Sequence, residues 1–312
     1  MNLSTMTAFK TLNYDGIGIA IEGDVLRKCQ KVILKIAEDV VGLLEKHGIW
    51  YQLSGGTALG AVREQGFIPW DDDIDLNVLG KDFETIGRLV EAEYPDTYVF
   101  HYYNTPGYGI PIGRIVLKNS VFLDRDGVGV PDCGFFIDLF PIENVPDNPA
   151  LRKLHGYLCQ AAGGLLSCRK FFKNRSFFRA LAAQNPEIRT VFRIKIALGG
   201  LIAFLPLPAC ARITDHVFGL CRDENSEYVA IPSGRKHYFG EMYRRSGMIG
   251  TEAHVFEGHR WQVAKDYDAY FKVLYGPDYM TPPPPEAREH HIIMKLVFPE
   301  DMSQEAEQHG KD

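Results

Sequence analysis

The chain has 312 residues, 46% of them hydrophobic and 24% charged, which is typical of a soluble globular protein with one elaborated domain or two. The formal net charge of -6 gives no reason to expect nucleic-acid binding. Six cysteines occur without a Cys-x-x-Cys pair, and the N-terminus lacks the charged start and apolar core of a signal peptide. A disulfide framework is therefore not expected, and the pattern favours a cytoplasmic protein.

The first periodic segment follows a mixed lead-in. Between Asp24 and His47, apolar residues recur at steps of three and four, which predicts a helix with one face packed on a sheet. Gly48 is typical of the position just past a helix end.

A glycine turn follows a short apolar run. Ile49 to Leu53 predicts a buried strand, and Gly55 and Gly56 allow a tight turn that brings the backbone close to a ligand. We expect Thr57 to cap a short helix over residues 58–63. A helix start after such a turn directs N–H groups and a positive dipole end outward, which suits a phosphate.

The next strand is expected to begin at Asp73-Ile-Asp-Leu76. On a period of two, Asp73 and Asp75 share one face, and a divalent cation such as Mg2+ or Mn2+ would relieve their repulsion. Asp71-Asp-Asp73 alone would also suit a solvated acidic turn. The glycine turn just upstream favours the metal, because a phosphate grip beside paired carboxylates is what phosphoryl or nucleotidyl transfer requires.

These pieces together resemble the core motif of the LicD family, within the nucleotidyltransferase-fold superfamily. The similar segments are Gly55-Gly-Thr57, Gly60-Ala-Val-Arg63 and Gly66-Phe-Ile-Pro-Trp-Asp-Asp-Asp-Ile-Asp75. Ala58 and Glu64-Gln65 differ from the family's pattern, but these differences do not affect the residues that would carry the chemistry. The resemblance implies that Gly55, Gly56, Thr57 and Arg63 bind the donor.

Residues 81–93 predict a second helix, and residues 98–103 predict a strand. Ile110 to Leu117 and Val121 to Leu123 predict a hairpin or two successive strands. Within the first of these, Arg114 has the geometry to contact a donor phosphate, but it suits a surface or salt-bridging position equally well.

Gly134-Phe-Phe-Ile-Asp-Leu-Phe-Pro141 predicts an apolar strand with one acid, Asp138, at its centre. A buried carboxylate is costly unless it is paired or binds metal. LicD-like sequences have a similar segment, which implies that Asp138 is the third carboxylate of the site, as a metal ligand or a base. The alternative is a structural aspartate.

Residues 151–222 are helical in pattern and more basic than the rest. The nearly uncharged run Ile196–Ala211 is too short to span a bilayer. It predicts a buried helical hairpin or, beside the basic and aromatic run Arg169–Phe178, a surface that rests on a membrane.

The C-terminal part predicts a hairpin over 255–263 with Gly258 at its turn, and a helix over 266–275 that ends at Gly276. A proline run and the pair His290-His291 follow. LicD-type proteins end in a similar order.

The resemblance implies an α/β nucleotidyltransferase-like fold, a mixed sheet flanked by helices with a helical insertion. We expect a lead-in (1–22), a catalytic core (23–145), the insertion (146–240), a LicD-like C-terminal segment (241–300) and a disordered tail (301–312). The implied activity is Mg2+-dependent transfer of a phosphocholine-type group from CDP-choline or a similar donor to a glycan or glycolipid, as in lipopolysaccharide or teichoic acid biosynthesis. The site would comprise Asp73, Asp75 and Asp138.

Two rival functions remain open from the sequence. A nucleotidyltransferase would keep the site but transfer the nucleotide half of its donor. A catalytically silent binding protein would keep only the fold, although three intact aspartates argue against it.

Overall fold

The computed structural model describes residues 18–19, 21–288 and 293–300. In this part of the chain, seven strands form one mixed sheet. Its path runs β1-β2-β6-β4-β3, and β7 and β8 continue from β6. β2 and β6 are parallel, and the other neighbours are antiparallel. The strands of this sheet are β1 (Tyr51–Leu53), β2 (Asp75–Leu79), β3 (Tyr98–His101), β4 (Gly113–Leu117), β6 (Phe136–Val145), β7 (Tyr228–Ala230) and β8 (Met242–Arg244).

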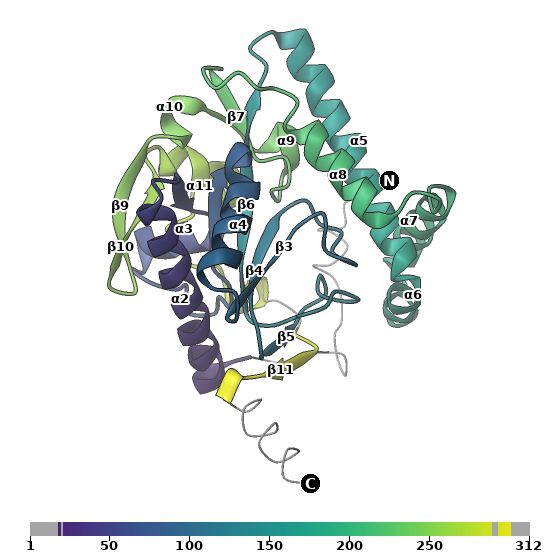
Figure 1. Ribbon diagram of the computed structural model, residues 1–312, viewed down its shortest axis with the longest axis horizontal. Coiled ribbons are helices and arrows are strands. Elements are labelled where there is room, and N and C mark those ends of the chain that lie inside the picture. The colour runs from purple at the N-terminus through teal and green to yellow at the C-terminus, as the bar shows by residue number, and fades with distance from the viewer. Residues whose placement is uncertain (1–17, 20, 289–292, 301–312) are drawn as a thin grey trace.

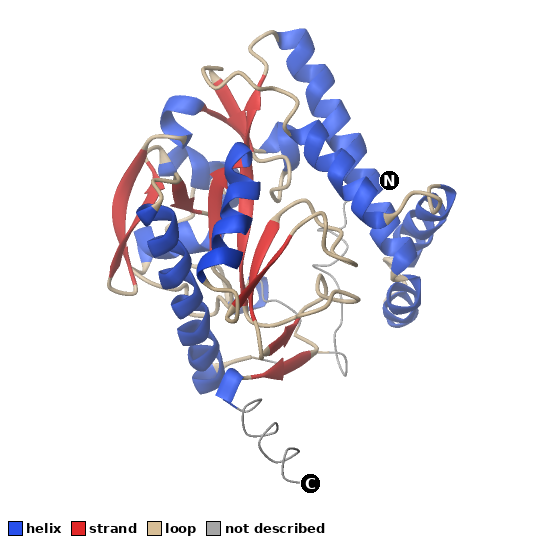
Figure 2. Cartoon of the chain, in the orientation of Figure 1, coloured by secondary structure: helices blue, strands red, loops and turns tan. Residues whose placement is uncertain are grey.

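Helices flank this sheet, as Figure 2 shows, so the predicted α/β class is confirmed. The long helix α2 buries Ile33, Ile36, Val40 and Leu44 in the main core, as its periodicity predicted. The helices are α2 (Gly23–Lys46), α3 (Gly55–Arg63), η1 (Gly80–Asp82), α4 (Phe83–Glu93), α5 (Pro149–Lys173), α6 (Arg175–Gln184), α7 (Arg189–Leu201), α8 (Leu207–Phe218), α9 (His237–Gly240), α10 (Arg245–Met248), α11 (Tyr267–Tyr275) and η2 (Pro285–Ala287).

Two smaller, two-stranded sheets lie outside the seven-stranded sheet in the described part of the chain. β9 (Thr251–Phe256) and β10 (His259–Ala264) form the predicted hairpin, and Glu257 and Gly258, both with positive φ, make its turn. β5 (Val121–Leu123) pairs with β11 (Lys295–Val297), whereas β4 pairs with β3 and β6. The alternative of two successive strands therefore holds, and the hairpin alternative is wrong.

Helices α5 to α8 form a separate layer, at the right of Figure 1. This layer has its own small core, in which the rings of Phe171 and Phe178 stack with centroids 3.9 Å apart and Phe192 meets both edge-on. The helical unit ends at Phe218, and the chain then returns to the main sheet as β7. None of the described helices is long and apolar enough to cross a membrane.

The run Ile196–Ala211 forms the end of α7, a short turn and the start of α8. Both helices pack mainly against α5 and hardly against each other, so the predicted buried helical hairpin is wrong. The run is buried on one side only: Ile196, Leu207 and Ala211 are buried, but Leu201 and Phe204 are 74% and 79% exposed. All six cysteines are unpaired. The two terminal regions and His290-His291 lie outside the described residues.

Candidate active site

The glycine turn is fixed by three tertiary contacts. Gly55 adopts a positive φ of 50°, a conformation that glycine takes without strain. Its N–H donates to the Tyr270 hydroxyl at 2.9 Å, and Ser54 Oγ lies 3.1 Å from the same hydroxyl. Ser54 N–H donates to the carbonyl of Asp75 at 2.9 Å. Tyr270 of α11 therefore holds the turn from the far end of the chain.

Helix α3 begins at Gly55, three residues earlier than predicted, with Ser54 at the N-cap position. The prediction that Thr57 caps the helix is wrong, because Thr57 lies inside its first turn. Its hydroxyl instead accepts from Asp75 N–H at 2.9 Å. Thr57 thus fixes the start of β2 against α3, and the first N–H groups of the helix, which lack partners within it, lie at the turn.

The second strand also begins later than predicted, at Asp75. Asp73 precedes the strand, so Asp73 and Asp75 do not share a strand face as the period of two suggested. A side chain added at Gly55 would place its Cβ 3.5 Å from Asp75 Oδ2, which shows how closely this carboxylate approaches the turn.

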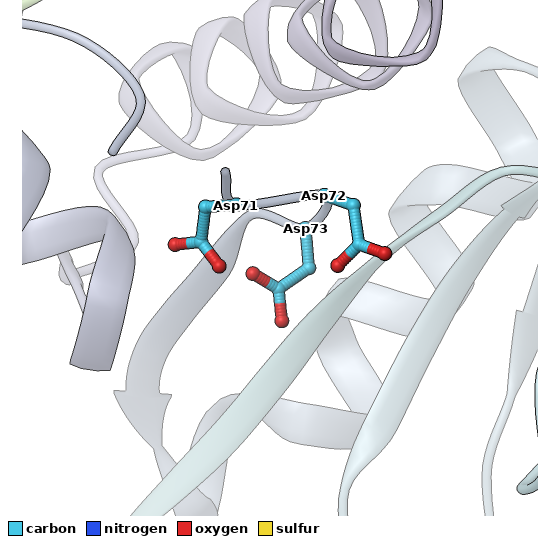
Figure 3. A group of neighbouring side chains, drawn as sticks. All are labelled: Asp71, Asp72 and Asp73. Atoms are coloured by element: carbon cyan, nitrogen blue, oxygen red, sulfur yellow. The ribbon is translucent and has the colours of Figure 1, made fainter. Parts of the chain in front are cut away.

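The connection into β2 carries three carboxylates close together. One carboxylate oxygen from each of Asp71, Asp72 and Asp73 lies within 4.8 Å of the other two. Figure 3 shows these three neighbouring side chains. A Cβ at Gly56 would lie only 2.6 Å from Asp71 Oδ2, so this carboxylate rests directly on the glycine turn. Gln30 of α2 supports the connection by donating to the Asp71 carbonyl at 2.9 Å.

This donor set fits a hard divalent cation. Mg2+ takes oxygen ligands and is held in proteins by one or two carboxylates together with substrate phosphates. The carboxylates of Asp71 and Asp73 are partly exposed, whereas Asp72 is buried beside α2. Burial and, to a smaller extent, the charge of Asp72 raise the pKa of the Cys29 thiol to about 12.

Asp138 lies on the neighbouring strand in register with Asp75. The parallel pairing of β2 and β6 therefore places these two predicted site residues side by side on one face of the sheet. Asp138 is 8% exposed. Two strands that are distant in sequence thus place Asp75 and Asp138 next to each other.

Arg114 is the partner of Asp138. Its Nε and Nη2 donate to the two Asp138 oxygens at 2.8 and 3.0 Å, and Nη1 donates to Asp124 at 3.1 Å. The guanidinium also stacks over Phe136, 3.5 Å from the ring centroid. The sequence left open whether Arg114 contacts a phosphate or lies at a surface or salt-bridging position. In the structure it forms a buried salt bridge, and a phosphate contact would require the guanidinium to rearrange.

Arg63 lies at the other end of α3, about 12 Å along the helix axis from the glycine turn. Its Nε donates to Glu64 at 2.8 Å and its Nη1 to the Tyr279 carbonyl at 2.9 Å. The structure therefore ties Arg63 to the C-terminal segment and does not bring it to the predicted phosphate grip.

Two tyrosines of α11, Tyr270 and Tyr275, lie at the glycine turn but were not among the site residues predicted from the sequence. The Tyr275 hydroxyl would lie 3.7 Å from a Cβ at Gly55. Burial raises the pKa of this hydroxyl, and the neighbouring Tyr270, Asp71 and Asp75 raise it further, although the residue as a whole is 37% exposed. The predicted helix over 266–275 contained both residues, but only the tertiary fold shows that they face the turn.

Comparisons with known proteins converge on one family. The nucleotidyltransferase domain described as LicD/FKTN/FKRP matches residues 48–108, which include the glycine turn and Asp71 to Asp75 but not Arg114 or Asp138. The chain is 26% identical over 292 residues to the lipopolysaccharide cholinephosphotransferase LicD of Haemophilus influenzae, covering 88% of this chain and 98% of that protein. It is also 42% identical over 65 residues to human ribitol 5-phosphate transferase FKRP, which is 21% of this chain and 13% of FKRP.

Proposed function

We propose that this chain, which belongs to the LicD family, is a transferase of phosphorus-containing groups. It moves a phosphorylated small group, of the phosphocholine kind, from a CDP-linked donor to a hydroxyl of a cell-surface glycan or glycolipid precursor. The acceptor oxygen bonds to the phosphorus of the transferred group, the bond from that phosphorus to the CMP oxygen breaks, and the acceptor proton passes to a base.

One observation carries this proposal. The carboxylates of Asp71 and Asp75 rest against Gly56 and Gly55, so carboxylates suited to a divalent cation lie beside a helix start suited to a phosphate. This part of the chain lies within the region that matches the family domain. The turn would hold the donor diphosphate through backbone N–H groups and the helix dipole.

The side chains around the turn have separate roles in this scheme. Tyr270 and Thr57 fix the turn and the strand start through the hydrogen bonds described above. Asp73 and Asp75, with Asp71 beside them, would hold Mg2+ or Mn2+, which when bound neutralises charge on the donor diphosphate. Asp138 would complete the site as a ligand or as the base. Its pairing with Arg114 leaves this open, because each carboxylate oxygen has a second lone pair.

The names of the relatives support the choice of donor and acceptor. The protein from Haemophilus influenzae is named for transfer of phosphocholine to lipopolysaccharide, which favours CDP-choline as donor and a lipid-linked glycan as acceptor. FKRP is named for ribitol 5-phosphate transfer, which favours CDP-ribitol as second choice. We propose that the chain acts in the cytoplasm at the inner face of the plasma membrane, on precursors of lipopolysaccharide or teichoic acid.

A thermal-shift screen tests the donor and the metal together. CDP-choline, CDP-ribitol, CDP-glycerol and CTP are each added with and without Mg2+, since a ligand that binds the native state raises the unfolding temperature. We expect one CDP-linked donor to raise it only when Mg2+ is present, and the Asp75→Asn variant to lose that rise. If CTP is the only compound that raises the unfolding temperature, nucleotidyl transfer is favoured. If no compound raises it, a catalytically silent binding protein is favoured.

A further inference from the structure

Charge is strongly segregated along the chain. Residues 149–218, which form α5 to α8, hold eleven Lys and Arg but only two Asp and Glu, a net charge of +9. The remaining residues hold 23 basic and 38 acidic side chains, a net charge of -15. The helical layer is therefore a basic unit attached to an acidic core.

Apolar side chains are exposed on the same layer. On α5, Leu151, Leu154, Leu158 and Leu165 are 56%, 56%, 42% and 50% exposed. Their spacings of three, four and seven residues place them in one stripe along the helix. Such a stripe on an outer helix indicates a surface that meets something apolar.

The turn between α7 and α8 continues this stripe. Arg169 of α5 donates to the Leu205 and Ala203 carbonyls at 2.9 and 3.4 Å, which holds the turn beside the C-terminal half of α5. This places the exposed Leu201 and Phe204 next to the end of the stripe. We call the four leucines of α5, with Leu201 and Phe204, the apolar stripe.

Basic side chains border the stripe at this end. The Arg169 and Arg175 guanidinium carbons lie 5.9 and 4.9 Å from the centroid of the Phe172 ring, which is seven residues along α5 from Leu165. Lys173 is exposed between them. Apolar side chains flanked by cations are the pattern of a helix that lies in a membrane interface, where the cations meet anionic headgroups.

We propose that the layer α5–α8 docks on an anionic lipid bilayer, with the apolar stripe inserted among the acyl chains and the exposed Lys173 and Arg175 at the phosphates. A second copy fits this surface poorly, because each copy would bring a charge of +9 to the contact. The inference goes beyond the proposed reaction, since docking needs neither donor nor metal. It would hold the acidic catalytic core beside a lipid-linked acceptor.

Co-sedimentation with vesicles tests the docking without donor or acceptor present. We expect the full chain to sediment with phosphatidylglycerol/phosphatidylcholine vesicles, to bind phosphatidylcholine vesicles less, and to be released by salt. Leu201→Ser/Phe204→Ser should weaken the binding roughly tenfold or more. The matched control is Val25→Ser/Met280→Ser, which alters two exposed apolar side chains outside the layer and should bind like wild type.

A second pair of variants tests the charge. Lys173→Gln/Arg175→Gln should weaken binding roughly tenfold at low salt, whereas Lys31→Gln/Lys265→Gln, which removes two exposed charges elsewhere, should not. Absence of sedimentation at low salt, or equal losses in the variants and their controls, would overturn the proposal. Light scattering provides a further test. If wild type is a dimer and Leu201→Ser/Phe204→Ser is a monomer, the proposal is also overturned, because the apolar stripe would then contact a second copy of the chain.

Discussion

Single residues of the site differ in how far the sequence could reveal them. Asp75 was predictable as one of two carboxylates just after the glycine turn, and Asp138 because an acid within an apolar strand needs a partner. The structure places the two in register on β2 and β6. Asp71 was interpreted only as part of an acidic turn, because its approach to Gly56 depends on the path of the connection into β2. The approach of Tyr275 to the turn was not predicted, since it depends on how α11 packs.

Asp73→Asn and Asp75→Asn should each abolish Mg2+-dependent turnover while the fold is kept. Asparagine retains the shape of the side chain but loses the charge that holds the cation. Turnover and circular dichroism are measured on the same preparations. A folded variant with turnover near wild type would remove that residue from the metal site.

Asp138→Asn should cost stability as well as activity. Asp138 accepts two hydrogen bonds from the buried Arg114, and removing one partner of a buried ion pair costs about 3–5 kcal/mol. Asp124 remains on Arg114, so we expect the lower end of this range in urea unfolding. Unchanged stability would show that the ion pair contributes little, and normal turnover of the folded fraction would remove Asp138 from the catalytic set.

At the scale of elements, the order of helices and strands around the site was predictable but their boundaries were not. Helix α3 starts three residues before its predicted position because Gly55 can adopt a positive φ while its N–H is held by Tyr270. The strand β2 starts at Asp75 because Thr57 accepts from that N–H. Both boundaries depend on contacts between segments, which a local pattern does not contain.

Gly56→Ala should reduce activity strongly while lowering stability little. The added Cβ would lie 2.6 Å from Asp71 Oδ2, so the carboxylate must move away from the turn. Gly42→Ala on α2 is the control, since its Cβ would meet nothing within 4 Å and alanine is favoured in a helix by about 1 kcal/mol. Unfolding temperature and turnover are compared, and normal turnover of Gly56→Ala would show that the contact with Asp71 is not needed.

For the whole molecule, the sequence indicated a basic helical segment but not how it meets the core. That junction contains the buried Glu143 of β6 and the half-buried Asp215 of α8, which accepts from the Tyr102 hydroxyl. Burial and, to a smaller extent, the charge of Asp215 together raise the pKa of Glu143 to about 8. The attachment of the helical layer to the sheet should therefore depend on pH.

The direction of this pH dependence follows from the raised pKa of Glu143. Glu143 binds its proton more tightly in the folded state, so its contribution to stability is complete below its ordinary value of 4.5 and is lost as pH rises towards about 8. We expect the free energy of unfolding to fall between pH 5 and pH 8, and Glu143→Gln to reduce that fall. Burial raises the pKa of Glu241 to about 7, so Glu241 should cause part of the fall in stability that remains in Glu143→Gln.

Urea unfolding at pH 5, 6.5 and 8 measures this dependence. Glu91→Gln removes an exposed carboxylate of α4 and should leave the profile unchanged. A profile of Glu143→Gln that is as steep as wild type would show that Glu143 is not the titrating group.

The position of bond cleavage in the donor distinguishes transfer of the phosphorylated group from transfer of the nucleotide. The chain is incubated with CDP-choline and CDP-ribitol in 18O-labelled water with Mg2+, so that water replaces the acceptor, and the products are analysed by mass spectrometry. If the phosphorylated group is transferred, the label enters phosphocholine or ribitol phosphate, and CMP leaves unlabelled. Label in CMP would rule out this transfer, because the nucleotide phosphorus would then be the one attacked.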